Sequence, residues 1–453
     1  GYLGYDGKME AAPTPPPNSR LIQTVLYLAD PYRYYKRVFA RWGDTFLFPS
    51  FNGDVVLSRD PQAAKIIFTL DPADFTVHAV DRLRSIVGSH SVLALEGDRH
   101  KRERKLLNPP FHGARMRSYG TQMQEAALQE ISRWQPGPGL DLHRAMQRIS
   151  LTIITRAVFG IVDPAQVERT QAVATEYMDS MSPLVLMFPF LAHDWLGLSP
   201  WARMQRARQE FDSLLYEQIA ARRKQPVGED ILSLLLSTRY EDGSGMTDEQ
   251  IHSELLTLLI AGHETTALSL SWLFYHLYRH PETLVRLRRE LDALGPRPEP
   301  EQIAQTPYLD ACCQETLRLY PIVGEVFRQL RRPLELGRFR VPAGTSVSVS
   351  VIGLHTNPAL YPEPETFRPE RFLERKYSPF EFVPFGGGIR RCLGAAFAMY
   401  EMKQVAYAVL QSCELELATA RVIKPVMRGP TMGPKGGVQM RLCRRREPTA
   451  AQS

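Results

Sequence analysis

The longest helix that the sequence predicts begins at Thr247 and runs towards His280, and no other segment constrains the fold as much. The Thr247 hydroxyl can cap the first turn while Gln250, three residues further on, reaches back to it, and Pro281 ends the helix. Residues 255–260 form a largely apolar run, which is typical of a helix inside a large core. A chain of 453 residues, 44% of them hydrophobic, can build such a core.

Around this helix the sequence predicts further helices and a few strands. Helical patterns occupy residues 284–291, 308–319 and 393–410. Strands are expected at residues 45–48 and 55–58, and again at residues 346–351, where serine alternates with valine. Helices therefore dominate the middle and the end of the chain. The predicted fold class is mainly α with small β-sheets.

The chain is expected to form one domain. No repeat and no Gly/Ser-rich linker follows the proline-rich N-terminal segment, so residues 20–453 are predicted to be a single domain and residues 1–19 a flexible arm. Residues 1–8 precede Met9, and the sequence leaves open whether they are native or a remnant of expression.

Charge and cysteine content limit the partners and the compartment. Lys and Arg outnumber Asp and Glu by only 55 to 49, which suits an acidic partner but gives no argument for nucleic acid. Five cysteines without C-x-x-C spacing favour a reducing compartment. The apolar run at residues 21–29 is short and interrupted by Gln23 and Thr24, so it predicts no membrane anchor. We expect a cytoplasmic protein.

Cys392 lies between a glycine-rich loop and the expected start of a helix. Unpaired N–H groups at a helix start lower the pKa of a thiol, and glycines let a flat ligand approach the backbone. Arg390 can then neutralise a carboxylate at the edge of such a ligand. Taken alone, a cysteine is more often a small buried hydrophobic residue, so the surrounding pattern has to decide between the two interpretations.

A polar group, residues 261–266, interrupts the long apolar helix. Gly262 removes a side chain where a ligand could sit, and Glu264 places an acid beside the hydroxyl of Thr265. The alternative is a solvated turn. Because the group lies in mid-helix, we interpret it as a functional kink that faces a ligand.

Five residues, Phe385, Gly388, Arg390, Cys392 and Gly394, match the pattern F-x-x-G-x-R-x-C-x-G. In this ten-residue motif the chain resembles the cytochrome P450 superfamily, and the resemblance extends through most of the chain and weakens only at the termini. The resemblance implies a large helical domain around haem b, a minor N-terminal β region, and Cys392 as the axial ligand of the iron. The cofactor contacts that it implies are His100, Arg104, Ala261, Gly262, Arg328, Phe385, Gly386, Arg390, Cys392 and Gly394.

The resemblance also assigns roles outside the cysteine motif. Glu264 and Thr265 look like the family's acid–alcohol pair, in which the hydroxyl steadies dioxygen and water and the acid relays protons. The set Glu315, Arg318 and Arg371 resembles a buried triad that supports the cysteine loop structurally.

Three basic residues match positions that bind haem propionates. His100 and Arg104 lie four residues apart and therefore share one helical face, whereas Arg328 stands in a loop-like setting. Each of them has an alternative as a solvated basic residue. A histidine at position 100 favours the soluble bacterial branch of the family, because many membrane-bound relatives carry tryptophan at the matching position.

The activity that the resemblance implies is that of a haem-thiolate monooxygenase. It would use dioxygen and two electrons to hydroxylate or epoxidise an apolar small molecule such as a terpenoid, fatty acid or steroid. The expected substrate contacts are Val80, Val87, Leu259, Ala261, Val323, Val326 and Met432. The apolar residues 184–195 could form a lid, and the alternatives for them are core packing or a surface that touches a membrane.

The expected electron donor is a separate protein, a ferredoxin or flavodoxin with its reductase, since a full haem domain leaves no room for an attached one. Lys101, Arg102, Arg390 and Arg391 are expected to form a basic face for it, unless they are simply solvated. The protein is expected to be a monomer.

Other classes remain open at this point. A haem-thiolate peroxygenase or isomerase would use the same cysteine, but such relatives typically lack the acid–alcohol pair. A haem-based gas sensor would have no need of a proton relay, and product formation would exclude it. A helical scaffold without a cofactor would leave the cysteine motif unexplained.

Overall fold

The computed structural model of the chain describes residues 20–51, 53–111, 114–161, 163–181, 193–194, 197–428 and 430–446. Helices make up most of it. The α-helices are α1 (Arg20–Ala29), α2 (Pro31–Trp42), α3 (Pro61–Phe68), α4 (Val80–Val87), α5 (Gly97–Leu107), α6 (Ala114–Ser132), α7 (Leu142–Phe159), α8 (Pro164–Ser180), α10 (Pro200–Arg223), α11 (Ile231–Ser237), α12 (Asp248–Arg279), α13 (Pro281–Asp292), α14 (Pro300–Ala304), α15 (Pro307–Leu319), α16 (Val351–His355), α17 (Arg371–Glu374) and α18 (Ala395–Ser412).

The strands are short by comparison. They are β1 (Thr45–Phe48), β2 (Val55–Ser58), β3 (Phe75–Thr76), β4 (Gly137–Asp141), β5 (Glu325–Leu330), β6 (Leu334–Leu336), β7 (Phe339–Val341), β8 (Ser346–Ser350), β9 (Cys413–Leu417), β10 (Pro425–Arg428), β11 (Thr431–Pro434) and β12 (Gln439–Arg445). This balance of long helices and small sheets confirms the predicted fold class.

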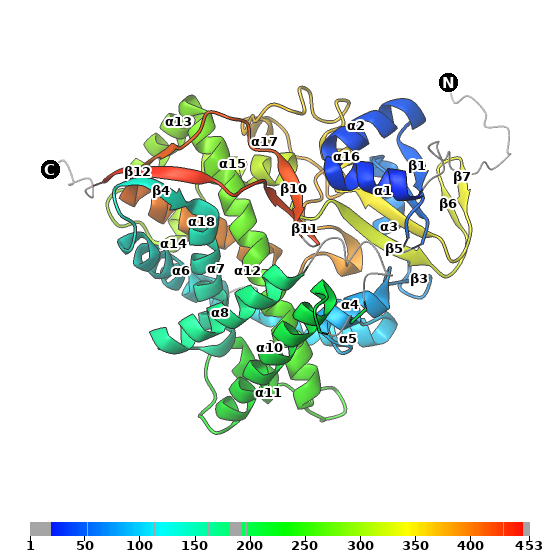
Figure 1. The fold of residues 1–453 in the computed structure, drawn as a ribbon, viewed down its shortest axis with the longest axis horizontal. Coiled ribbons are helices and arrows are strands. Elements are labelled where there is room, and N and C mark those ends of the chain that lie inside the picture. The colour runs from blue at the N-terminus through cyan, green and yellow to red at the C-terminus, as the bar shows by residue number, and fades with distance from the viewer. Residues whose placement is uncertain are drawn as a thin grey trace.

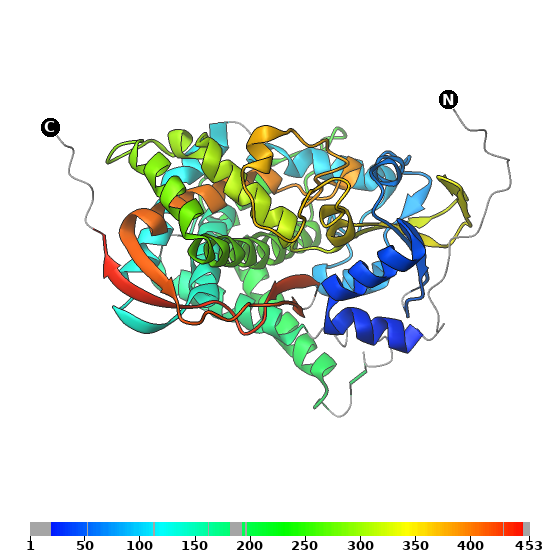
Figure 2. The same ribbon diagram turned by 90° about the horizontal axis from the view of Figure 1, so that it is seen from above.

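Helix α12 runs through the middle of the molecule (Figures 1 and 2). The predicted capping box is confirmed: the Gln250 N–H donates to Thr247 Oγ1 at 3.2 Å, and the Thr247 N–H donates to Gln250 Oε1 at 2.8 Å. The helix packs most extensively against α7 and is buried along nearly its whole length in the main hydrophobic core. It therefore sets the position of every element around it.

A five-stranded sheet in the order β1-β2-β8-β5-β3 forms the β region, with β2 and β8 parallel and the other pairs antiparallel. Its two faces are both covered. Val56, Val347 and Val349 pack into a core with α3, while Val55 and Leu57 belong to a core with α1 and α2. Because side chains alternate between the faces of a strand, the predicted valine–serine alternation places the valines of β8 in one core.

Two details of the predicted elements were wrong. Val351 is the first residue of α16 and does not continue β8, because the Ser350 hydroxyl caps the new helix by accepting from the Gly353 N–H at 3.1 Å. The end of the chain is not helical: after α18, strand β12 pairs with β9 on one side and β4 on the other.

Among the described residues no single helix is long and apolar enough to cross a bilayer. One bent pair, α7 with α8, has the required length and composition only when the two helices are taken together.

Candidate functional site

Cys392 lies in the loop that leads into α18; the residue has exposed surface, although protein atoms crowd around its sulfur. The loop closes on itself, because the Cys392 N–H donates to the Phe385 carbonyl at 2.9 Å. Gly394 has open space where a Cβ would stand, and a Cβ at Gly386 would make only ordinary contact with Val326 at 3.6 Å. These two glycines therefore leave the backbone accessible beside the thiol.

The other two glycines of the loop have a different reason to be glycine. A Cβ at Gly387 would stand 2.2 Å from the Phe68 ring, and one at Gly388 would stand 1.9 Å from the Phe68 carbonyl oxygen. Gly388 also has a φ of 64°, in the left-handed region that favours glycine. The expectation that the glycine run serves a flat ligand is thus wrong for Gly387 and Gly388, which let the loop pack against α3.

The thiol environment also differs from the prediction. Burial among protein atoms raises the pKa of Cys392, and the Gly394 N–H, Arg104 and Arg391 offset this only in part. Gly394 is the N-cap residue of α18, so an N–H at the start of this helix does bond to the sulfur as expected, but burial outweighs it. The protein alone therefore does not make the thiolate, and a bound metal ion that binds the sulfur would supply that stabilisation.

Three arginines and a histidine gather beside the cysteine loop. The Arg390 guanidinium donates to the Leu93 carbonyl at 3.3 Å and to that of Leu95, and Arg328 donates to the Gly387 carbonyl at 3.2 Å. Arg104 donates to the Arg391 carbonyl at 2.6 Å. Arg328 was expected in a loop, but it lies in strand β5, which holds it buried.

The charges of this cluster are not balanced by acids. Burial, together with Arg390, Arg104 and Arg328, lowers the pKa of His100 to about 3. Burial, with Arg390 next to it, lowers the pKa of Arg328 to about 10. The carboxylate that acts on Arg390 is Glu96, which is itself paired with Arg331 at 2.9 Å. A site of this kind favours an anion with more than one charge, and the two propionate groups of haem b fit it.

The centre of α12 presents a small open face towards solvent. Ala261 is exposed and Thr265, one turn later, is half-buried, as are Ile260 and Gly262, whereas His263, Glu264 and Thr266 are buried. The Thr265 hydroxyl donates to the Ala261 carbonyl at 2.6 Å. The helix is continuous through these residues. The side of Gly262 that lacks a side chain faces α7, because a Cβ on it would stand 3.0 Å from Ile154 Cδ1, so close helix packing gives this position a reason to be glycine.

Glu264 points into a buried polar cluster between α7, α12 and β10. Its carboxylate accepts from Gln147 Nε2 at 2.7 Å and lies 3.5 Å from His143 Nε2 and 3.8 Å from Arg428 Nε. Burial alone would raise its pKa, but His143, His263 and Gln147 outweigh burial and lower the pKa overall. Glu264 and Thr265 are neighbours in the chain, but successive side chains point about 100° apart around a helix. The acid therefore lies in the polar cluster, whereas the hydroxyl lies on the open face of α12.

The predicted triad is brought together and is fully buried. Arg318 donates to both Glu315 oxygens, at 2.7 and 2.8 Å, and Arg371 Nε donates to Oε1 at 3.1 Å. Arg318 also donates to the His355 carbonyl at 2.8 Å, and His355 Nε2 accepts from the Val383 N–H at 2.9 Å. Burial, with Arg318 adding to it, lowers the pKa of His355 to about 3, so its ring is a neutral acceptor. The triad thus connects to the segment before the cysteine through His355, which the sequence analysis missed.

The predicted substrate contacts do not all share one surface. Val87 and Leu259 are buried in the main core, and Met432 in the core of α1 and α2. Val323 is exposed, and the Met432 N–H donates to the Ile322 carbonyl beside it at 2.9 Å. Val80 and Val326 are half-buried. Of residues 184–195, only 193 and 194 are described, so the proposed lid lies outside the described residues.

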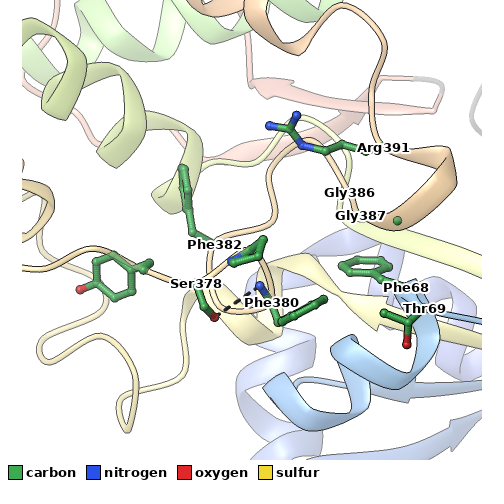
Figure 3. Close-up of a pocket in the computed structure, with 11 residues that line it drawn as sticks. Phe68, Thr69, Ser378, Phe380, Phe382, Gly386, Gly387 and Arg391 are labelled. Atoms are coloured by element: carbon green, nitrogen blue, oxygen red, sulfur yellow. Dashed lines mark hydrogen bonds between the residues drawn. The ribbon is translucent and has the colours of Figure 1, made fainter.

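Fewer basic side chains are available to an electron donor on this face than the sequence predicted. Arg390 turns inward to the cluster described above, and Lys101 and Arg102 pair with Asp98 and Asp242 at 3.4 and 3.2 Å. Arg391 is exposed and lines a cavity of about 440 Å³ between α3, the cysteine loop and residues 377–382 (Figure 3).

A second residue that the sequence analysis missed is Glu254. Its carboxylate accepts from the Val92 N–H at 2.7 Å, and Thr257 donates to Ser91 Oγ at 2.7 Å, so α12 holds the turn whose carbonyls bind Arg390. The signal in the sequence is an acid, Glu254, directly before the apolar run of residues 255–260 in the long helix.

Glu254→Leu is expected to destabilise the protein by about 1–3 kcal/mol, since it leaves the Val92 N–H buried without a partner. Glu254→Gln keeps the acceptor and serves as the matched control.

Burial, then Glu103, raises the pKa of Glu254 well above its usual 4.5, so the folded chain keeps this proton up to a higher pH than the unfolded chain does. Wild-type stability should therefore fall as the pH rises above 4.5, and less so in Glu254→Gln. Chemical denaturation at several pH values measures both effects, and equal stability of the two variants would contradict the assignment.

Comparison with known proteins agrees with this geometry. The family model described as Cytochrome P450 matches residues 13–440. The protein named "Putative cytochrome P450 138" of Mycobacterium tuberculosis (strain ATCC 25618 / H37Rv) is 35% identical over 448 residues, which cover 96% of this chain and 99% of that protein. "Putative cytochrome P450 135B1" of the same strain is 36% identical over 446 residues, covering 96% and 93%.

Solved structures share the fold. The structure of cyanobacterial CYP120A1 with bound retinoic acid superposes with a TM-score of 0.85 at 27% identity, covering 96% of this chain and 99% of that one. The cytochrome P450DA haem domain gives a TM-score of 0.83 at 23% identity, covering 97% and 99%. With the match to the family model over nearly the whole length, the chain belongs to the cytochrome P450 family of monooxygenases, whose cofactor is haem b.

Proposed function

We propose that this P450 monooxygenase hydroxylates or epoxidises an apolar terpenoid-like small molecule, with two electrons supplied by a separate ferredoxin or flavodoxin and its reductase. The observation that carries the assignment of the site is Cys392, an exposed residue, beside a cluster of Arg104, Arg328 and Arg390 whose nearby carboxylate, Glu96, is already paired with Arg331 at 2.9 Å. When bound, haem supplies the iron at which dioxygen is reduced.

In this proposal Cys392 binds the iron, and the basic cluster orients the cofactor through its two carboxylates. Neutral His100 adds a hydrogen bond without further charge. Buried positive charges left without partners are costly, so the cluster gains the most from a dianion. The same residues would therefore hold the cofactor by its carboxylates and orient it beside Cys392.

The open face of α12 supplies the proton-handling groups. The Thr265 hydroxyl donates to its own helix at Ala261, which leaves its oxygen as an acceptor towards the site. Glu264 holds its charge next to His143 and Gln147, so its side chain has to rotate out of that cluster and take up a proton from water before it can pass that proton towards Thr265. We propose this rotation as the step that couples the buried cluster to the reaction.

Thr265→Ala is expected to lower the product formed per electron by about tenfold, with the electrons appearing as hydrogen peroxide, because the acceptor for the proton relay is lost. Thr266→Ala is the matched control, since Thr266 also donates to a carbonyl four residues earlier, at 3.3 Å, but is buried. Product and peroxide are measured per electron consumed. Equal coupling in both variants would remove Thr265 from the relay, and efficient turnover with peroxide alone would favour a peroxygenase.

The substrate class follows from apolar candidates and from one relative. Ala261, Val323 and Val326 are accessible or half-buried apolar residues near the loop and α12. CYP120A1, at 27% identity, was solved with retinoic acid, an isoprenoid acid. A spectral binding screen of retinoids, other terpenoids, steroids and fatty acids should give the tightest binding for isoprenoids. Tighter binding of fatty acids or steroids would overturn this choice without affecting the monooxygenase assignment.

The remaining parts of the proposal concern the surroundings. All five cysteines are free thiols, which fits a reducing, cytoplasmic location. Arg391 and the cavity it lines offer a place on the cysteine-loop side for an acidic electron donor.

A further inference from the structure

The β10–β11 hairpin brings one charged side chain, Arg428, to the middle of α12. The hairpin packs against this helix, and Figure 1 shows the two side by side. On its other side the hairpin is bound to the segment before β5, because the Met432 N–H donates to the Ile322 carbonyl at 2.9 Å. The expected substrate contact Val323 follows directly in that segment. The hairpin therefore stands between α12 and a part of the chain that is expected to meet the substrate.

The two faces of the hairpin have different surroundings. Met427 and Met432 stand opposite each other in the strand register and pack in the core with α1 and α2. Because side chains alternate between the faces of a strand, Arg428 and Gly433 belong to the opposite face. A Cβ at Gly433 would stand 2.5 Å from Leu268 Cδ2 of α12 and 2.7 Å from Arg428 Cδ. The glycine thus leaves room for the Arg428 side chain to reach α12 across β11.

The guanidinium of Arg428 has spare hydrogen-bonding capacity. Its contact with Glu264 is an ion pair of 3.8 Å between Nε and Oε1, which is too long for a hydrogen bond. No residue within the described ranges accepts a hydrogen bond from its side chain, which is 34% exposed. Glu264 has nearer partners, since Gln147 Nε2 donates to it at 2.7 Å and His143 Nε2 lies 3.5 Å away. Both terminal amino groups of Arg428 can therefore donate to a ligand.

These features favour an anionic group on the ligand. The terminal amino groups of a guanidinium lie in one plane and can donate two parallel hydrogen bonds to the oxygens of a carboxylate. A wholly apolar substrate that covered Arg428 would remove water from its charge and offer no hydrogen bond in return. A carboxylate compensates that loss, and it does so beside apolar neighbours such as Leu268, where water screens the pair less than at an open surface. One side chain of single positive charge matches an acid of single negative charge.

We propose that the substrate is an apolar carboxylic acid and that Arg428 binds its carboxylate. Arg428 then determines specificity, because it favours an acid over the alcohol or ester of the same carbon skeleton. The inference rests on the proposed function, in which the substrate is an apolar small molecule, and it adds the polar group that this molecule carries. It does not depend on whether the skeleton is isoprenoid or straight.

The test is calorimetric titration of the haem-loaded, full-length protein with matched sets of ligands. One set is farnesoic acid, its methyl ester and farnesol, and the other is palmitic acid, its methyl ester and hexadecanol. At neutral pH both acids are ionised, since a free carboxyl group has a pKa of about 4–5. The wild type is expected to bind each acid about tenfold more tightly than its ester or alcohol, because the neutral groups do not accept two charge-assisted hydrogen bonds.

Arg428→Gln should weaken the binding of both acids by a factor of about ten to one hundred, and change the binding of the neutral ligands by less than about twofold. Arg428→Lys keeps the charge but loses the planar pair of donors, so an intermediate loss is expected for the acids. Gly433→Ala keeps Arg428 but crowds its side chain, and should also weaken the binding of the acids selectively.

Arg340→Gln is the matched control, since it removes one arginine charge from an exposed position in a second two-stranded hairpin, β6–β7. It should bind every ligand like the wild type, and an unchanged haem absorption spectrum shows that each variant is folded. The inference is overturned if the wild type binds acids no more tightly than neutral ligands. It is also overturned if Arg428→Gln weakens acids and neutral ligands equally, because Arg428 would then only support the hairpin or Glu264.

Both of these outcomes leave the proposed function intact, because the neutral ligands still bind. A protein that binds none of the ligands in either set and forms no product from them would contradict the inference and the proposed substrate together.

Discussion

Cys392→Ser is expected to abolish the red-shifted Soret band of the reduced carbon monoxide complex, together with monooxygenase activity. A serine hydroxyl is far less acidic than a thiol and does not replace a thiolate as an electron-donating ligand. The protein raises the pKa of this thiol by burying it, so the iron itself has to hold the thiolate form. The substitution therefore removes the bond that defines the cofactor's chemistry, while the backbone bond from Cys392 to Phe385 is kept.

The matched control for this experiment is Cys443→Ser, which changes the other exposed cysteine, in strand β12. It should retain the shifted band and full haem content. A Cys392→Ser protein that still shows the shifted band would contradict the ligand assignment, and a purified wild-type chain that binds no added haem would contradict the whole site.

Arg318→Leu is expected to cost about 3–5 kcal/mol of folding free energy and most of the bound haem, because it leaves the Glu315 carboxylate buried with an incomplete set of partners. Arg318 has no exposed surface, and it donates to the His355 and Pro364 carbonyls as well as to Glu315. The contact to His355 continues to Val383, just before the cysteine loop, so the loss should reach the haem site.

Chemical denaturation and haem content per chain measure this effect. The control is Arg169→Leu, which breaks a surface pair with two hydrogen bonds to Glu217, each 2.9 Å long. Exposed pairs are worth about 0.2–1 kcal/mol, so this variant should keep its haem. Equal losses in the two variants would show that the buried triad has no special role.

The sequence could predict the parts of the site that rest on local geometry. His100 and Arg104 share a face of α5 because any helix brings residues four apart together. The same rule places Glu315 beside Arg318 on α15, and the capping box fixes the start of α12 at Thr247. Further local signals were present but not used: Asp60-Pro61 and Asp163-Pro164 begin α3 and α8, with each aspartate as the cap.

Other properties depended on which element packs against which. Gly262 was expected to face a ligand, yet it faces Ile154, because α7 covers that side of α12. Arg390 was expected on a basic surface, but the carbonyls of Leu93 and Leu95 draw it inward. Strand β4 has the sequence GPGLD, which has little intrinsic preference for a strand, and it pairs with β12 some three hundred residues later. No local pattern contains such pairings.

By itself the sequence determined the family, the long central helix and the mainly helical fold, and it singled out Cys392 as the proposed ligand of the iron, because these depend on short motifs and on the helical repeat. Only the tertiary structure decided how Glu264 is held away from Thr265, why Gly387 and Gly388 are glycines, and which side of α1 faces outward. A helix fixes the angle between neighbouring side chains but not what stands opposite each of them. Contacts between segments far apart in the chain set which groups stand opposite each side chain. These contacts therefore decide the charge and the hydrogen bonds of the site residues.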